Sequence, residues 1–279
     1  MRILVTGYNG QLGYDVVRLL ESQGEEVLGT TMDDFDLTDE AGVKAFILNY
    51  KPDTVVHCAA YTLVDKAEDN REICYAVNVL GTKYIAEVCR EIGAKMVYIS
   101  TDYVFDGSKK GSYEINDEVS PVNYYGESKL QGERAVTETL ENYFIVRVSW
   151  VFGENGTNFV KTMLRLAETR DEISVVSDQV GSPTYTKDLA VLIAEMIRTD
   201  KYGTYHATNE GNCSWHEFAE AIFDLSGVAV KANGIPTSDY PTRAKRPMNS
   251  IMSKDSLDQA GFKRLPDWTD ALSRYLKKA

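Results

Sequence analysis

Short apolar runs alternate with helix-length stretches through the first two-thirds of the chain. The runs are continuously apolar, which is typical of strands buried on both faces. Strand, helix and strand in regular succession predict right-handed crossovers and a parallel sheet covered by helices on both sides. We therefore expect an α/β fold, a Rossmann-type doubly wound parallel sheet. The predicted strands are residues 3–5, 27–28, 54–56, 96–99 and 144–146, and the predicted helices are residues 11–23, 41–50, 75–92 and 128–140.

The texture changes after about Gly153, where glycine, proline and aromatic residues interrupt the pattern. Ser214 with Glu217 three residues later has the spacing of a capping box, which predicts a helix through about Leu225. We expect residues 153–279 to form mainly a smaller C-terminal lobe, with one helix near 186–199 returning to the domain of residues 1–152. Other helices are predicted at residues 157–169, 189–198, 254–259 and 268–277.

Composition excludes several classes of protein. A formal net charge of −12 would repel a nucleic acid, so no nucleic-acid partner is expected. No apolar run approaches the roughly 20 residues that span a bilayer, and the N-terminus lacks a signal-peptide pattern, so we expect a cytoplasmic protein without a membrane partner. The four cysteines and three histidines show no ligand-type spacing, so no metal is predicted.

A glycine-rich turn directly follows the first predicted strand and opens the first predicted helix. Glycines at such a turn permit a tight bend, a close approach of the backbone to a pyrophosphate, and close packing of helix on strand. The helix N-terminus then offers free N–H groups to the phosphates. Residues 1–152 are therefore predicted to bind NAD(P), through Gly7, Gly10, Gln11, Leu12 and Gly13.

The end of the second predicted strand bears on which nicotinamide cofactor is used. Thr30 and Thr31 stand where an acidic residue would bind the ribose hydroxyls of NADH. Without that carboxylate a 2′-phosphate is less strongly rejected, so NADPH is favoured, with NADH as the alternative. Asp36 and Leu37 lie either beside the adenine or in a solvated loop turn.

Tyr125 and Lys129 are four residues apart, which places both on one face if the segment is helical. A phenol has a pKa of about 10, and a nearby ammonium is expected to lower that pKa. Tyr125 could then donate a proton to a carbonyl oxygen while a hydride reaches the carbon. A solvated helix face is the alternative interpretation of the pair taken alone.

A hydroxyl-rich segment follows the fourth predicted strand, at the edge where doubly wound sheets bind ligands. Its side chains could hydrogen-bond a substrate carbonyl and orient it. Thr101 is the predicted residue for this role and Ser100 is the second choice. The order of the glycine turn, strand-end hydroxyl and Tyr–Lys pair favours a reductase.

These segments resemble the extended short-chain dehydrogenase/reductase family and, more narrowly, the dTDP-4-dehydrorhamnose reductases. The resemblance covers nearly the whole chain. It includes residues 7–13, 58–68, Asn78, 100–107, 125–133, 149–150, 178–184 and 246–250. Tyr61 departs from the family pattern, in which a histidine is expected.

The resemblance implies reduction of the C4 keto group of dTDP-4-dehydro-L-rhamnose to dTDP-L-rhamnose. Thr101, Tyr125 and Lys129 would be the catalytic residues. The cofactor would also contact Ala59, Ala60, Tyr61 and Asn78. The nucleotide-sugar would contact Val64, Asp102, Val104, Phe105 and Trp150, with Asn158 and Arg246 facing its diphosphate. Trp150 could instead be a core aromatic residue, and Arg243, Lys245 and Arg246 a solvated basic turn.

Other interpretations remain open. Some relatives bind magnesium at a subunit interface, but its carboxylates cannot be placed here; a homodimer is possible. A nucleotide-sugar dehydratase or epimerase could use the same scaffold. Dehydratases need an acid pair after the threonine, and Tyr103 follows Asp102 here. A non-catalytic regulatory subunit, like the reductase-like partner of methionine adenosyltransferase, is a further alternative that the Tyr125–Lys129 pair disfavours.

Overall fold

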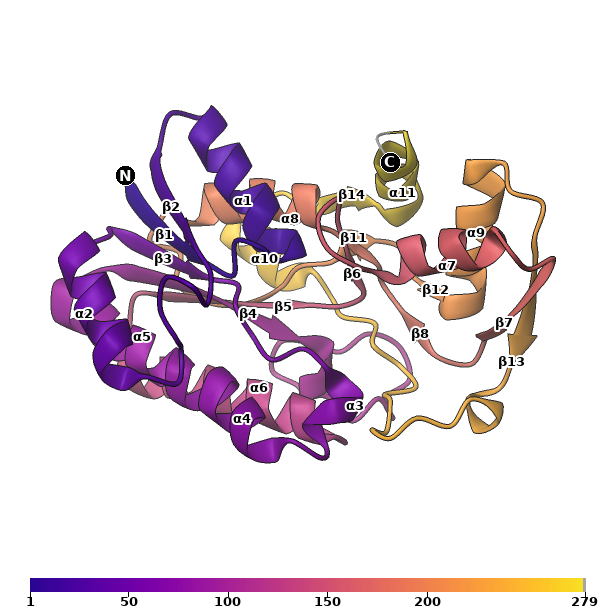
Figure 1. The fold of residues 1–279 in the computed structure, drawn as a ribbon, viewed down its shortest axis with the longest axis horizontal. Coiled ribbons are helices and arrows are strands. Elements are labelled where there is room, and N and C mark those ends of the chain that lie inside the picture. Colours follow the sequence, from indigo (N-terminus) through magenta and orange to yellow (C-terminus); the bar gives the residue numbers. More distant parts are fainter. Residues whose placement is uncertain (278–279) are drawn as a thin grey trace.

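Six parallel strands form the central sheet of the computed structural model, which describes residues 1–277 (Figure 1). Their order across the sheet is β10-β5-β4-β3-β1-β2. The Rossmann-type doubly wound fold is thus confirmed, and the five predicted strands are all present. The strands are β1 (Arg2–Thr6), β2 (Glu26–Thr30), β3 (Thr54–His57), β4 (Lys95–Thr101), β5 (Tyr143–Val148) and β10 (Gly203–His206).

Helices cover both faces of this sheet, as Figure 1 shows. On one face α1 (Gln11–Ser22), α8 (Thr186–Met196) and α10 (Asp255–Ala260) bury an apolar cluster that includes Ile3, Val16 and Ile193. On the other, α2 (Glu40–Tyr50), α5 (Thr82–Ile92) and α6 (Tyr124–Thr139) bury a second cluster that includes Leu4 and Val136. Burial on both sides explains why the strands read as continuous apolar runs.

One predicted helix, residues 75–92, is not continuous. The chain forms α4 (Arg71–Tyr75), then a π-helical turn (Ala76–Gly81), and only then α5. The π turn contains Asn78, which is almost wholly buried. π-helical turns are rare in proteins, and those that do occur often lie at functional sites.

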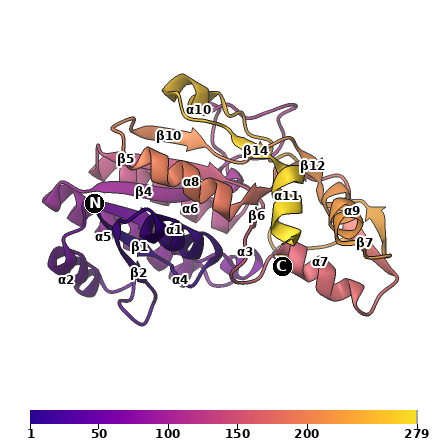
Figure 2. The same cartoon turned by 90° about the horizontal axis from the view of Figure 1, so that it is seen from above.

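Residues from Phe152 onward build a third apolar cluster. Figure 2 shows the helices of this cluster together at the opposite end of the molecule from α2. The cluster is rich in aromatic side chains. The predicted capping box of Ser214 and Glu217 is present and begins α9. The elements of this region are β6 (Val151–Phe152), α7 (Phe159–Ala167), β7 (Glu172–Val176), β8 (Val180–Gly181), β9 (Thr184–Tyr185), β11 (Asn209–Glu210), β12 (Cys213–Ser214), α9 (Trp215–Ser226), β13 (Lys231–Ile235), β14 (Leu265–Asp267) and α11 (Trp268–Leu276).

Helix α8 lies outside this third cluster and returns to the sheet. Leu189 and Ile193 are fully buried in the same cluster as Val16 of α1. Strand β10, which follows α8, then pairs with β5 in parallel at the edge of the sheet. No helix within residues 1–277 has both the length and the apolar character needed to cross a membrane.

Candidate active site

The glycine turn lies between the carboxyl end of β1 and the start of α1. Gly7 has a φ of 71°, and a Cβ there would come within 2.8 Å of the Ala59 nitrogen. A Cβ on Gly13 would come within 2.4 Å of the Gly7 oxygen. Gly10 caps α1 without a side-chain hydrogen bond, and the first turn carries no acidic residue. Gly7 and Gly13 thus let the turn pack closely on the loop after β3 and on the start of α1. The first N–H groups of α1 have no side-chain cap, which fits a bound pyrophosphate.

The loop after β2 contains the residues expected near the adenine. Asp36 is exposed, and its carboxylate accepts a 2.8 Å hydrogen bond from the Thr38 N–H. Leu37 is buried, with its Cβ close to Gly81. Asp36 therefore forms a solvated loop turn, one of the two alternatives, and contact of the Asp36–Leu37 backbone with adenine stays a prediction.

Asn78 joins the loop after β3 to helix α6. Its side-chain oxygen accepts a 2.8 Å hydrogen bond from the Tyr61 N–H, and its amide donates to the Tyr61 carbonyl at 3.1 Å and to the Ser128 hydroxyl at 2.9 Å. Asn78 thus holds protein groups in place. Its predicted role in cofactor binding would act through Tyr61 and Ser128.

A cavity of about 200 Å³ opens at the carboxyl ends of β3, β4 and β5. Because the ends of parallel strands meet at one edge, residues far apart in the sequence come together there. The cavity brings together seven of the predicted site residues. They are Ala60, Val64, Thr101, Asp102, Tyr125, Lys129 and Trp150, and the lining also includes Cys58, Thr62, Ile99, Ser100, Tyr103, Val148 and Ser149.

Helix α6 carries the Tyr–Lys pair into this cavity. Asn123 caps the helix and its side-chain oxygen accepts a 2.9 Å hydrogen bond from the Gly126 N–H. A Cβ on Gly126 would lie 2.2 Å from the Tyr103 carbonyl oxygen, so glycine lets α6 approach the segment after β4. The Tyr103 and Tyr125 rings then meet edge to face at 5.6 Å. The predicted helical spacing of Tyr125 and Lys129 is confirmed.

Burial governs the electrostatics of the pair. The pKa of Tyr125 is raised by burial and then by the charge of Asp102, and a hydrogen bond with Thr101 opposes this rise. The expectation that Lys129 lowers the pKa of Tyr125 overall is therefore wrong for the chain by itself. Burial lowers the pKa of Lys129 to about 7, against the charge of Glu133. The Lys129 ammonium lies 4.0 Å from the centroid of the Tyr98 ring.

A buried ion pair lies behind the site. The Arg147 guanidinium donates two hydrogen bonds to Glu133, at 2.9 and 2.7 Å, and the Ser100 hydroxyl donates to Glu133 at 2.5 Å. The Ser100 hydroxyl thus donates to a residue outside the cavity, whereas the Thr101 hydroxyl bonds Asp102 and Tyr125, which both line it. Thr101 stays the predicted residue for the carbonyl. The sequence interpretation missed Glu133 and Arg147, although a charged residue within an apolar strand was a signal for the latter.

Two residues predicted to contact the nucleotide-sugar do not border the cavity. The side chains of Val104 and Phe105 are fully buried in a separate apolar cluster. The Phe105 ring stacks on Tyr113 at 4.3 Å, and the Arg147 guanidinium lies 5.2 Å from its centroid. Both side chains are thus packed inside the protein, and a contact of this segment with the substrate stays a prediction.

Asn158 is also committed to the protein. It caps α7, and its amide donates to the Gln11 side chain at 3.0 Å and to the Gly153 carbonyl at 2.9 Å. The side chain thus ties α7 to the glycine turn, and its contact with the diphosphate stays a prediction.

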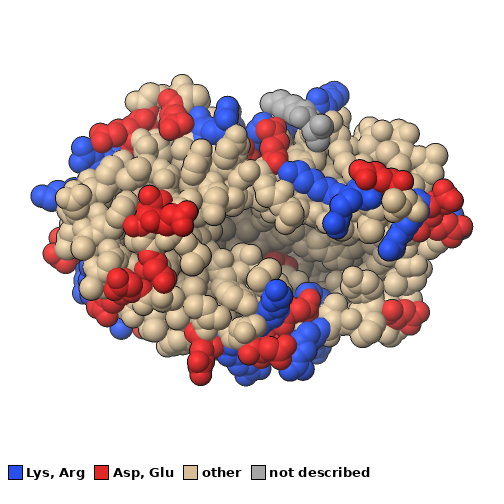
Figure 3. All heavy atoms as spheres, viewed as in Figure 1, with Lys and Arg blue, Asp and Glu red and all other residues tan. Residues whose placement is uncertain are grey.

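Arg246 approaches the site from the segment after β13. One nitrogen of its guanidinium donates to Asp65 at 2.8 Å, whereas Nη1 is buried and makes no hydrogen bond within the described chain. Arg243 is exposed and pairs with Asp69 at 2.8 Å, as a solvated basic turn would. Figure 3 shows this face hollowed at its centre, with basic and acidic groups interleaved along the lower rim. Arg246 therefore has one buried guanidinium nitrogen without a partner among the described residues, and its contact with the diphosphate stays a prediction.

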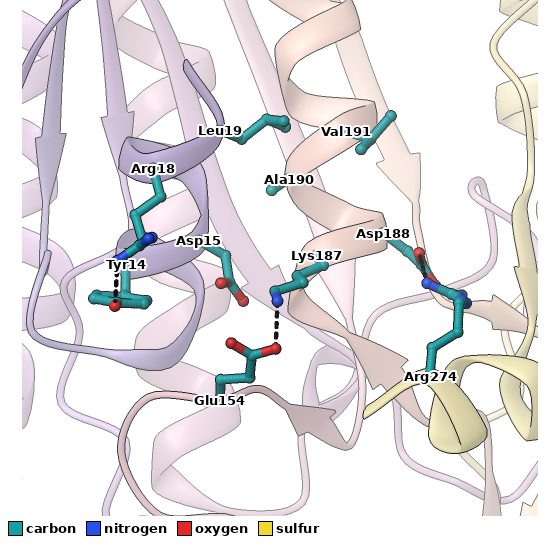
Figure 4. Close-up of a pocket in the computed structure, with 10 residues that line it drawn as sticks. All are labelled: Tyr14, Asp15, Arg18, Leu19, Glu154, Lys187, Asp188, Ala190, Val191 and Arg274. Atoms are coloured by element: carbon teal, nitrogen blue, oxygen red, sulfur yellow. Dashed lines mark hydrogen bonds and ion pairs between the residues drawn. The ribbon is translucent and has the colours of Figure 1, made fainter. Parts of the chain in front are cut away.

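A larger cavity, of about 500 Å³, shares no lining residue with the first (Figure 4). Its polar groups bind one another: Arg274 donates two hydrogen bonds to Asp188, Thr186 donates to Asp15 at 2.5 Å, and Lys187 pairs with Glu154. These contacts join α1, α8 and α11. The one phenol that lines this cavity, Tyr14, accepts a 2.8 Å hydrogen bond from Arg18, and no serine or threonine among the described residues lines the cavity beside it. Within residues 1–277 no group of three His, Cys, Asp or Glu side chains is arranged to hold a metal, and the prediction of no metal remains untested.

A glycine turn fit for a pyrophosphate and a Tyr–Lys helix above the same edge of the sheet define the class of the protein, a short-chain dehydrogenase/reductase. The family model described as "RmlD substrate binding domain" matches residues 1–279. The chain belongs to the RmlD family of NAD(P)-dependent reductases.

Individual relatives resemble the chain along its whole length. A dTDP-4-dehydrorhamnose reductase of Aggregatibacter actinomycetemcomitans is 45% identical, over 97% of this chain and 97% of its own length. The spore coat polysaccharide biosynthesis protein SpsK of Bacillus subtilis is 42% identical, over 99% of this chain and 97% of its own. The crystal structure of a dTDP-4-dehydrorhamnose reductase from Bacillus anthracis in complex with NADP matches with a TM-score of 0.98 and 42% identity, covering 100% of this chain and 99% of that one.

Proposed function

We propose that this chain reduces the C4 keto group of dTDP-4-dehydro-L-rhamnose to give dTDP-L-rhamnose, with NADPH as the favoured cofactor and NADH as the alternative. The observation that carries the proposal is the single cavity shared by Thr101, Asp102, Tyr125, Lys129 and Trp150. The similarity to relatives named dTDP-4-dehydrorhamnose reductase supports it, as does the NADP held by the Bacillus anthracis structure.

The catalytic residues act on the carbonyl oxygen. The raised pKa of Tyr125 keeps the phenol protonated near neutrality, so it can donate a proton as negative charge develops on that oxygen. The Thr101 hydroxyl orients the carbonyl by exchanging its hydrogen bond to Asp102 for one to the carbonyl oxygen. The Lys129 ammonium stabilises the phenolate that remains after proton transfer. A nicotinamide cofactor, when bound, supplies the hydride that this reduction requires.

We assign cofactor binding to residues 1–152 and substrate binding mainly to residues 153–279. The glycine turn from Gly7 to Gly13 would hold the pyrophosphate, and Ala59, Ala60 and Tyr61 would border the cofactor, with Lys129 on its nicotinamide ribose. Val64, Asp102 and Trp150 would contact the sugar, while Arg246 offers its free Nη1 to the diphosphate.

A coupled assay tests the proposal. dTDP-glucose is converted by its dehydratase and epimerase, the purified protein is added with NADPH, and the loss of NADPH absorbance is followed while the final sugar is identified. We expect dTDP-L-rhamnose in amounts equal to the NADPH consumed. If a different reduced sugar is formed, the site acts on another nucleotide-sugar. The similarity to SpsK, a spore coat polysaccharide biosynthesis protein, is the reason to test for this outcome.

Other outcomes would reject the reductase itself. Tightly retained NAD⁺ in the purified protein, with isomerisation or dehydration of the sugar, would indicate an epimerase or dehydratase. Binding of NADPH without turnover of any keto-sugar would indicate the regulatory subunit of methionine adenosyltransferase or a similar role. Homodimerisation and a cytoplasmic location stay predictions.

A further inference from the structure

Trp150, a wall of the candidate active site, has an unusual backbone conformation. Its φ is 48°, and within residues 1–277 the only other non-glycine residue with a positive φ is Lys51, at the end of α2. The left-handed region is unfavourable for a bulky residue, so the surroundings must fix it. Hydrogen bonds from Thr184 do so, because its N–H donates to the Trp150 carbonyl at 3.1 Å and its hydroxyl to the Ser149 carbonyl at 2.6 Å.

The Trp150 indole has two close neighbours. One is Gly181, where a Cβ would come within 2.7 Å of the indole ring. The other is Trp215, whose ring is stacked on Trp150 with centroids 3.7 Å apart and planes at 13°. Trp215 in turn contacts the Phe159 ring at 4.6 Å. Close contacts with both neighbours thus restrict where the indole can lie.

The two neighbours are fixed to each other by the backbone. Gly181 is in β8 and pairs with Cys213 in the antiparallel strand β12. Trp215 begins α9 directly after β12, where the Ser214 and Glu217 capping box sets the start of the helix. One short sheet therefore sets the distance between Gly181 and Trp215, the two neighbours of the Trp150 indole. We call Gly181, Trp150 and Trp215 together the clamp.

We propose that Trp215 is a positioning residue for substrate recognition. By stacking on Trp150 within this clamp, Trp215 holds the Trp150 indole in place as a wall of the sugar pocket. The inference rests on the proposed function, because Trp150 is taken to contact the sugar of a nucleotide-sugar. Trp215 does not line the cavity, so it acts through Trp150. The clamp links the fold of the region after Phe152 to the shape of the pocket.

Circular dichroism tests the clamp without substrate. The chain has three tryptophans, so a Trp268→Phe background leaves only the two stacked indoles. Closely stacked indoles give an exciton couplet in the far ultraviolet. We expect the couplet in this background, its loss in Trp215→Ala, and a changed couplet in Gly181→Ala, because the new methyl group displaces the Trp150 ring. A couplet that survives Trp215→Ala, or is absent from the parent, would overturn the clamp.

Kinetics test its role in recognition. Trp215→Ala should raise the KM for the nucleotide-sugar roughly tenfold, while kcat and the KM for NADPH change by less than about threefold. Trp215→Phe keeps a stacking ring and should restore the KM to near the wild-type value. Gly181→Ala should raise the same KM without altering Trp215, which covers the case in which Trp215→Ala fails to fold.

Two results would reject the positioning role. One is an unchanged KM for the nucleotide-sugar in Gly181→Ala and Trp215→Ala. The other is an equal fall in kcat and NADPH affinity that Trp215→Phe does not restore, which would leave Trp215 with a role in folding alone. If the wild-type protein reduces no keto-sugar, the proposed function fails, whereas the couplet still decides whether the clamp exists.

Discussion

The hydroxyl of Thr101 donates a 2.9 Å hydrogen bond to the neighbouring carboxylate of Asp102, and both side chains are almost wholly buried. The second oxygen of that carboxylate, Oδ2, is buried without a well-formed hydrogen bond in the described chain, although the Ser250 hydroxyl lies near enough to the carboxylate to oppose the rise of its pKa. A buried acceptor in this condition is unfavourable for folding. Asp102 borders the cavity beside Tyr125, so a sugar hydroxyl could donate a hydrogen bond to this oxygen. Asp102 would then lower the stability of the free protein and strengthen the binding of substrate.

Asp102→Asn should therefore stabilise the protein near neutral pH while weakening substrate binding. Burial raises the pKa of Asp102 to about 6, above the value of about 3.9 in an unfolded chain. The free-energy cost of ionising the buried Asp102 carboxylate is absent below pH 4, where the carboxyl is protonated in both states. This cost grows between pH 4 and 6 and reaches its full value above pH 6. At pH 7.5 the gain should be of order 3 kcal/mol. Urea unfolding from pH 4 to 8 measures it.

Asp106 provides a control of opposite sign. Hydrogen bonds from the Ser108 hydroxyl and N–H and from the Tyr113 hydroxyl lower the pKa of Asp106 to about 2. Its contribution to stability is therefore present above pH 4 and lost as pH falls through 2. Asp106→Asn should destabilise the protein at pH 7.5. If both variants shift stability in the same direction, the interpretation of Asp102 is wrong.

Tyr125→Phe should lower kcat by about 10²–10⁴-fold, because only the phenol hydroxyl is removed from the carbonyl site. The ring and its contact with Tyr103 remain, so the melting temperature and the Kd for NADPH should stay close to those of the wild type. Tyr124 is a matched control, since its ring lies beneath Arg71 and does not line the cavity. Full activity in Tyr125→Phe would rule out its role as the proton donor.

Lys129→Met should abolish activity and yet stabilise the fold. Burial lowers the pKa of Lys129 to about 7 from about 10.4 in an unfolded chain, so its cost is complete below pH 7 and disappears as pH rises toward 10. We expect a gain of roughly 2–4 kcal/mol at pH 6 in chemical unfolding. Lys254 is buried too, and burial lowers its pKa, but it lies outside the cavity. Lys254→Met should therefore stabilise without affecting kcat.

The sheet and the meeting of Thr101, Tyr125 and Lys129 in one cavity could be predicted because their signals are local. Ile3 and Val5 read as a buried strand and are fully buried, and the spacing of Tyr125 and Lys129 needs only a helix. The edge strand β10 was missed because it is short and carries polar residues such as Thr204 and His206. An edge strand such as β10 forms hydrogen bonds with one neighbouring strand, here β5. This pairing determines whether the segment is a strand more than an apolar pattern in its sequence does.

Other features depend on the tertiary structure. The apolar spacing of residues 75–92 is helical throughout, and the π turn coincides with contacts that Asn78 makes to distant segments. The side chain of Phe105 is directed into the core by its stack on Tyr113, which no sequence motif reveals. The pKa of Tyr125 was predicted in the wrong direction because adjacent charges can be read from a sequence whereas burial cannot.

Asn78→Ala should destabilise the protein by about 2–3 kcal/mol, because it removes the side-chain partner of the Tyr61 N–H and carbonyl. It also removes one donor to the Ser128 hydroxyl, which keeps its hydrogen bond to the Tyr125 carbonyl. The loop that contains Tyr61 would also loosen beside the glycine turn, so the KM for NADPH should rise more than the KM for the nucleotide-sugar. Asn70→Ala is the control, since Asn70 is exposed and donates only to the Lys66 carbonyl. Should Asn78→Ala lose stability while the KM for NADPH stays constant, the amide supports the fold but does not position the cofactor loop.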